Sequence, residues 1–344
     1  MAVLCRACAL LFYVAGAQRA SSQQPSLRGT VVSAETGQPL GYSIVELQPG
    51  LGQQFTTASG AFAFSALQPG TYLLTVRQIA YTPVDTQIVL REDGETVVRV
   101  ALRHLAIELP AVTVAATQCT TPGPPEPSDT ALRAVFDQLQ ENSRHYELLA
   151  DSYPFRYALE ISERTVNQRG DTGKPEIRRL RFYSSDYHPY AVGRVVEPAW
   201  GPWGDPENTL VIHSAELQDL GNPRFIANHC FRLVGLDTIA GDTLVRVDFE
   251  PAKHLGSPDM AGAAYLDPTT YELRYTVTSL TRPERSSLTD VRSMSFRTSF
   301  RNIAPGVPLQ DSLTAITIYR YGQRAKIDTQ RTTDVRFTRQ APHP

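Results

Sequence analysis

The amino-acid sequence predicts a mainly β protein: a small β-sandwich, then one helix and a large, curved, half-barrel-like antiparallel sheet. Three observations lead to this prediction. Short runs with period-two hydrophobicity recur between residues 29 and 114, a proline-rich stretch follows at 117–128, and alternating runs return after residue 153. A chain of 344 residues is long enough for two or three folded domains.

The first residues are typical of an export signal. Arg6 precedes an apolar run over residues 7–15, and Ala15-Gly16-Ala17 fits the small-residue rule for signal-peptide cleavage. We therefore expect residues 1–17 to be a signal peptide and residues 18–26 a polar linker. The alternative, a short buried helix, has nothing to pack against, because the residues that follow are polar.

Composition excludes some classes of partner. The chain has 33 Lys and Arg against 35 Asp and Glu, so it lacks the basic balance of a nucleic-acid-binding protein. No later apolar run approaches the roughly 20 residues that a membrane-spanning helix needs. We expect an exported protein that is periplasmic, outer-membrane-associated or secreted.

The sandwich is indicated by its turns. Gly37 and Gly70 tolerate tight reversals, while Pro39 and Pro69 preset the backbone beside them. Between these turns, alternating apolar residues form candidate core faces. No polar chemistry is clustered here, which is typical of a module that binds, supports or tethers.

Between residues 27 and 116 several motifs occur in order: Gly29-x-Val31, Thr36-Gly37-x-Pro39-Leu40, Val45-x-Leu47, Thr57-x-x-Gly60-x-Phe62-x-Phe64, Leu67-x-Pro69-Gly70-x-Tyr72-x-Leu74 and Leu109-x-x-Val112-x-Val114. Together they resemble the carboxypeptidase regulatory-like domain. The resemblance implies a transthyretin-like sandwich of seven strands that serves as an accessory domain in bacterial envelope proteins, not as a peptidase. Ala58 and Ala80 depart from the family pattern, which often has Asp and Gly there.

A connector and a helix follow the sandwich. Prolines in residues 117–128 favour an extended spacer, so we place a domain boundary there. Ser128 or Asp129 can cap a helix whose apolar positions follow helical spacing and which ends before Pro154. We expect this helix to cover the sheet that follows, within a second domain at 129–344.

The second domain is predicted from alternating runs and turn signals. We expect strands at 155–166, 176–183, 190–197, 209–213, 231–236, 243–250, 261–266, 271–280, 293–300, 315–321 and 334–339. Two of the turns, at 237–242 and 267–270, read as hairpins.

Part of this domain weakly resembles LolA-type lipoprotein carriers and other outer-membrane-associated β domains. The motifs are Val234-Gly235-x-Asp237-x-Ile239-x-Gly241, Val247-x-Phe249-x-Pro251 and Gly262-x-Ala264-Tyr265-Leu266-Asp267-x-x-Thr270-x-Glu272-Leu273. The resemblance implies a concave apolar sheet closed by a helix, which can hold acyl chains. The alternative is that core side chains fill the same face.

Cys119 and Cys230 are the two cysteines that remain after removal of the leader. In an exported chain, a single pair favours one disulfide over two buried thiols. This disulfide would join the connector to the second domain. Two cysteines cannot complete the ligand shell of a zinc site.

The sequence offers no catalytic motif. His145-Tyr146-Glu147 lacks the second histidine of a metalloprotease helix, and the seven histidines are scattered singly. We therefore expect no catalytic residue, no metal and no cofactor. A hydrolase would require convergent groups, for which Asp248, Glu250, Asp259 and Asp267 are candidates, although turn chemistry explains them equally well.

Trp200 and Trp203 lie in a Gly/Pro loop and form a candidate recognition loop, since tryptophans stack on sugars or anchor partners. Local packing is the alternative. We interpret the chain as an exported, non-enzymatic accessory or binding protein of the bacterial envelope, with an envelope protein, lipid or glycan as partner and no nucleic acid. The alternatives are a periplasmic lipid or lipoprotein carrier with an apolar cavity under the helix, and a carbohydrate-recognising module.

Overall fold

The computed structural model describes residues 25–50, 52–92, 94–109, 118–200, 206–304, 306–322 and 324–338. The expected leader at 1–17 lies outside the described residues. Within them, no helix combines the length and apolar character that crossing a membrane requires.

Seven strands form the N-terminal sandwich: β1 (Ser26–Ser33), β2 (Ile44–Gln48), β3 (Gln53–Phe55), β4 (Ala61–Phe64), β5 (Gly70–Arg77), β6 (Val84–Leu90) and β7 (Glu95–Leu102). They make a three-stranded sheet, β4-β1-β7, and a four-stranded sheet, β3-β2-β5-β6. β1 pairs in parallel with β7, while the other pairs in both sheets are antiparallel. Side chains that include Leu27, Leu47 and Leu74 fill the space between the sheets. The predicted seven-stranded sandwich is confirmed.

Helix α1 (Thr130–Ser152) begins where the sequence predicts it. The Asp129 side chain caps it by accepting a hydrogen bond from the Leu132 amide, 3.1 Å between Oδ1 and N. The helix ends before Pro154, as the loss of a backbone donor at proline favours. Its apolar positions are buried along its whole length.

The C-terminal part is built around a nine-stranded antiparallel sheet in the order β12-β13-β14-β15-β16-β17-β18-β8-β9. β12 and β9 are its two edges, so the sheet is curved but not closed. A separate hairpin, β10-β11, and two short helical segments complete this part. The elements are β8 (Phe155–Val166), β9 (Glu176–Tyr183), β10 (Val196–Trp200), β11 (Pro206–Ile212), η1 (Gln218–Gly221), α2 (Pro223–Asn228), β12 (His229–Ile239), β13 (Asp242–Pro251), β14 (Asp259–Leu266), β15 (Leu273–Thr281), η2 (Pro283–Arg285), β16 (Val291–Ala304), β17 (Val307–Tyr319) and β18 (Ala325–Phe337).

The strand expected at 190–197 was placed too early, because β10 begins only at Val196. The preceding residues are held in a loop by Asp219, whose Oδ1 accepts hydrogen bonds from the Tyr187 hydroxyl (2.6 Å) and the Tyr190 amide (3.1 Å). A turn in which the Arg194 amide donates to the Ala191 carbonyl then leads into β10. The loop is rich in apolar and β-branched residues, which is why its sequence resembles a strand.

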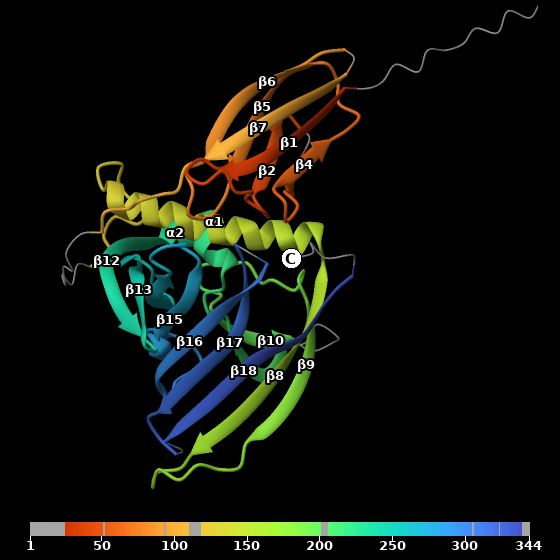
Figure 1. Ribbon diagram of the computed structural model, residues 1–344. Helices are drawn as coiled ribbons and strands as arrows, with labels where there is room; N and C mark the ends of the chain where they lie inside the picture. The colour runs from red at the N-terminus through yellow and green to blue at the C-terminus, as the bar shows by residue number, and fades with distance from the viewer. Residues whose placement is uncertain are drawn as a thin grey trace, which may run out of the picture.

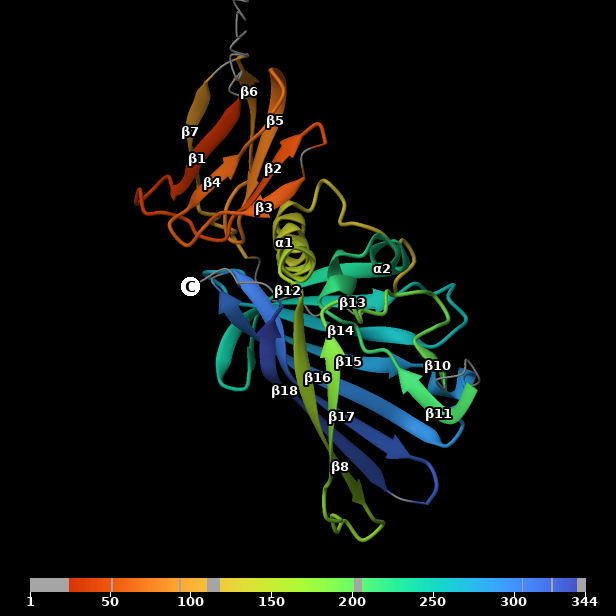
Figure 2. The ribbon, with the colours of Figure 1, turned by 90° about the vertical axis from the view of Figure 1, so that its right-hand side faces the viewer.

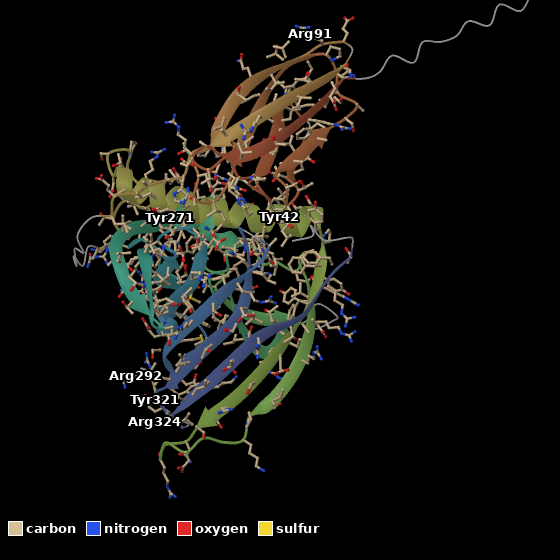
Figure 3. The ribbon with its side chains drawn as sticks, viewed as in Figure 1. Tyr42, Arg91, Tyr271, Arg292, Tyr321 and Arg324 are labelled. Atoms are coloured by element: carbon tan, nitrogen blue, oxygen red, sulfur yellow. A yellow bond between two sulfur atoms is a disulfide. The ribbon has the colours of Figure 1, made fainter. Side chains whose placement is uncertain are left out.

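Helix α1 lies between the sandwich and the nine-stranded sheet (Figure 1). Figure 2 looks nearly along the helix, with the sandwich above it and the curved sheet below. Tyr42 of the sandwich and Tyr271 of the sheet both lie beside α1 (Figure 3), and both belong to the one buried cluster that includes the helix. The helix therefore packs on two sides instead of only covering the sheet.

Candidate functional site

The predicted disulfide between Cys119 and Cys230 is present. It joins the connector to the first residues of β12, and the two Cα atoms are 5.5 Å apart. The connector is also held by backbone hydrogen bonds, from the Lys253 amide to the Cys119 carbonyl and from the Gly123 amide to the His229 carbonyl, both 2.9 Å. The pair is structural and offers no thiol for chemistry.

The side chains of the candidate recognition loop lie outside the described part of the structure. Trp200 is the last residue of β10, but only its backbone is described. Trp203 lies outside the described residues.

The acidic residues considered for a hydrolase serve separate contacts. Asp248 accepts hydrogen bonds from Arg232 and Arg246, both at 2.6 Å. Asp259 is fully buried and accepts from the Tyr190 hydroxyl at 2.6 Å. Asp267 accepts from the amides of the turn that follows it, at Thr269 and Thr270. Each of these three carboxylates therefore has a hydrogen-bond or ion-pair partner within the fold.

The space between α1 and the sheet is occupied by side chains. Leu139 and Leu149 of the helix are buried in the same cluster as Val247, Phe249 and Leu266 of the sheet. Beneath Leu139 and Leu149 the interior is therefore a packed core, whereas Leu132 of the helix, Phe231 and Phe249 line a hollow of about 430 Å³ beside the connector.

A cluster of arginines lies on the outer face of the sheet near its β9 edge. We call it the arginine surface; it consists of Arg156 on β8, Arg179 and Arg181 on β9, and Arg336 on β18. These four residues surround a hollow of about 260 Å³ together with Asp334. Four guanidinium groups against one carboxylate leave three positive charges in excess, on a protein whose net charge is −2.

The sheet register explains how these arginines meet. On β8, Arg156 lies directly across from Arg336 of β18. On the other side of β8, Ala158 lies directly across from Arg181 of β9. Because Phe155 is buried in the core, the next residue, Arg156, points to the opposite, outer face. Ala158 is 4% exposed although it faces the same way, so the long side chains around it cover the floor of the hollow.

The positive charges of the arginine surface are only partly balanced by neighbouring carboxylates. Asp334, at a bulge in β18 with φ of 52°, forms ion pairs with Arg179 and, at 3.8 Å, with Arg336. Glu160 of β8 lies directly across from Arg179 of β9 in the strand pairing. Two like charges directly across a strand pair, as at Arg156 and Arg336, destabilise a sheet unless an anion compensates them.

Protection of an open sheet edge explains only part of this arrangement. Charged residues on an edge strand discourage pairing with other chains, and β9 is an edge. However, β8 and β18 are interior strands, so this role accounts for Arg179 and Arg181 but not for Arg156 and Arg336.

A second polar cluster lies beside the β10-β11 hairpin. His188, Glu197 and His213 are the one group of metal-ligating side chains found together among the described residues. Sequence reasoning treated the histidines as isolated and found neither this cluster nor the arginine surface. Arg178-Arg179-x-Arg181 was the available signal for the arginine surface, but its partners from β8 and β18 become visible only in the sheet order.

None of the curated proteins matches this chain. A LolA superfamily protein from Nitrosomonas europaea is similar at 7% identity over 61% of this chain and 94% of that one, with a TM-score of 0.31. A DUF1329 family protein from Desulfovibrio piger is similar at 10% identity over 60% and 93%, with a TM-score of 0.34. Residues 26–103 match the model of the carboxypeptidase regulatory-like domain, which confirms the family resemblance of the sandwich.

Proposed function

We propose that the protein is an exported, non-enzymatic binding module of the bacterial envelope, and that its arginine surface binds a phosphate-bearing lipid headgroup. The observation that supports this proposal most strongly is the excess of three positive charges around one hollow. The sandwich acts as the accessory part, and the nine-stranded sheet presents the binding surface.

The chemistry of arginine favours phosphate. A guanidinium group is planar and always charged, and its parallel N–H donors match two oxygens of a phosphate. Arg156 and Arg181 have no ion-pair partner among the described residues, so their donors are available to an anion. A neutral glycan would not require this charge.

The shape of the site favours a headgroup over a protein. Cores of protein–protein interfaces are depleted in charge and enriched in apolar and aromatic side chains. The hollow instead gathers four arginines in about 260 Å³, a volume that suits a small anionic group. The packed core beneath Leu139 and Leu149 of α1 favours binding at this surface over carriage of an acyl chain in that part of the interior.

The test is sedimentation with vesicles of phosphatidylcholine, with or without phosphatidylglycerol. The wild type should bind only the anionic vesicles, and binding should weaken as salt is raised. At about 1 kcal/mol for each basic residue near an anionic surface, the double variant Arg156→Gln/Arg181→Gln should lose roughly 30-fold in affinity.

The matched control is Arg292→Gln/Arg324→Gln, which removes the same charge from two exposed arginines at the end of the sheet far from α1 (Figure 3). It should bind like the wild type. Equal losses in both double variants would mean that net charge alone governs binding and would refute the assignment of the site. Equal binding of neutral and anionic vesicles would refute the proposed ligand.

A further inference from the structure

We infer that His188, Glu197 and His213 form a binding site for one divalent transition-metal ion of the zinc type. Each residue offers one ligand atom, and the three atoms lie within 4.8 Å of one another. Glu197 Oε1 is 3.1 Å from Nε2 of both histidines. With zinc–ligand distances near 2.1 Å, ligand atoms in a tetrahedral site are roughly 3.4 Å apart, so the two 3.1 Å separations from Glu197 must lengthen by about 0.3 Å to admit the ion.

The fold sets the ligands in place without the ion. Glu197 pairs with Val211 across the β10-β11 hairpin, and the His213 amide donates to the Val195 carbonyl at 2.9 Å. Glu197 and His213 are therefore diagonal neighbours on one face of the hairpin. Two of the three ligands come from this single hairpin.

His188 comes from the loop before β10. Its ring stacks on that of His213, with centroids 4.1 Å apart and planes at 10°, so a ring must rotate before both Nε2 atoms point at one ion. The loop is fixed on both sides of His188, since Tyr187 and Tyr190 are hydrogen-bonded to the buried Asp219. The fold therefore brings the three ligand residues together, and binding requires side-chain rotation without a change in the backbone.

Arg194 is the positively charged side chain that contacts this triangle. Its Nε is 2.8 Å from Glu197 Oε2, and its Nη2 is 3.3 Å from Oε1 and 3.5 Å from His188 Nε2. The arginine side chain is 56% exposed, so it can leave Oε1 while an ion enters. An ion and a guanidinium compete for the same carboxylate oxygen, and their like charges repel.

The ligand set indicates which ion fits. Two imidazoles and one carboxylate suit zinc and its neighbours in the first transition row, whereas magnesium and calcium prefer oxygen ligands. Three protein ligands leave the fourth tetrahedral position for water or for a group from another molecule.

The competition between Arg194 and the ion gives a decisive test. Zinc binding to the untagged full-length protein is measured by calorimetry, with His254→Gln, an exposed histidine outside the cluster, as the control. We expect one zinc per chain, a loss of at least about tenfold in affinity for His213→Gln and Glu197→Gln, and no change for His254→Gln. Arg194→Gln should bind zinc roughly tenfold more tightly, because it removes the competing charge.

Cobalt binding adds a readout of the coordination geometry. Co²⁺ in the wild type should give the intense visible absorption of a tetrahedral site, and His213→Gln should abolish it. If the cluster is only an ion-pair network, Arg194→Gln will not tighten zinc binding and cobalt will remain octahedral. Either result, or zinc binding that survives His213→Gln unchanged, overturns the inference.

Discussion

The Cys119–Cys230 disulfide allows a stability prediction that can be worked out from the structure. We consider the double variant Cys119→Ser/Cys230→Ser. The connector keeps its backbone hydrogen bonds to the residues beside β12, so the native contacts at both ends of the disulfide survive the change. The loss therefore acts mainly on the unfolded chain, which gains freedom when the cross-link is removed.

The size of the effect follows from the length of the closed loop. The two cysteines are 111 residues apart in the sequence. The chain-entropy model gives about 4.8 kcal/mol at 25 °C for a loop of this length, as an upper value that any residual structure in the unfolded chain reduces. We expect the free energy of unfolding to fall by about 3–5 kcal/mol.

Unfolding in guanidinium chloride measures this loss. Both tryptophans of the chain, Trp200 and Trp203, belong to the C-terminal part, so their fluorescence reports on the part that the disulfide closes. A reducing agent should lower the stability of the wild type by the same amount and leave the double variant unchanged. A loss below about 1 kcal/mol under non-reducing conditions would refute the loop-closure reasoning.

Two further predictions concern polar groups that lie partly or fully buried. Burial, reinforced by the charge of Asp219, raises the pKa of Glu216 to about 8 from 4.5, so between these values the unfolded chain is ionised while the folded chain holds the proton. The free energy of unfolding should therefore fall as pH rises from 4.5 to 8. Glu216→Gln should flatten this part of the pH profile measured by thermal unfolding. An unchanged profile would contradict the raised pKa of Glu216. Gln138→Ala should lower the free energy of unfolding by about 1–3 kcal/mol, because the buried Ala80 amide loses its acceptor, Gln138 Oε1, at 2.7 Å. Asp137→Ala, on the same helix but without this hydrogen bond, is the matched control.

Local signals in the sequence were sufficient for the elements themselves. The cap at Asp129 and the proline at 154 delimit α1, and the turn residues at 237–242 and 267–270 mark two real hairpins. These features depend on interactions within a few residues, which a sequence displays directly. Ala80 shows the same principle, since its φ of 69° explains why the family often has glycine there.

Contacts between distant segments were not visible in the sequence. Gln138, Glu141 and His145 are polar residues of the helix, yet all three are buried because the sandwich packs on them. The arginine surface requires β18 to pair with β8, which brings Arg336 beside Arg156 across 180 positions of the chain. Neither arrangement has a periodicity that a single sequence reveals.

The most direct test of the binding surface is an NMR titration of the arginine side chains with a soluble short-chain phosphatidylglycerol. Single Arg→Lys variants assign the side-chain Nε–Hε signals of the arginine surface. These four signals should shift together and saturate, while those of Arg292 and Arg324 stay in place. Shifts confined to other arginines, or none at any concentration that leaves the lipid monomeric, would contradict a headgroup site on the outer face of β8, β9 and β18.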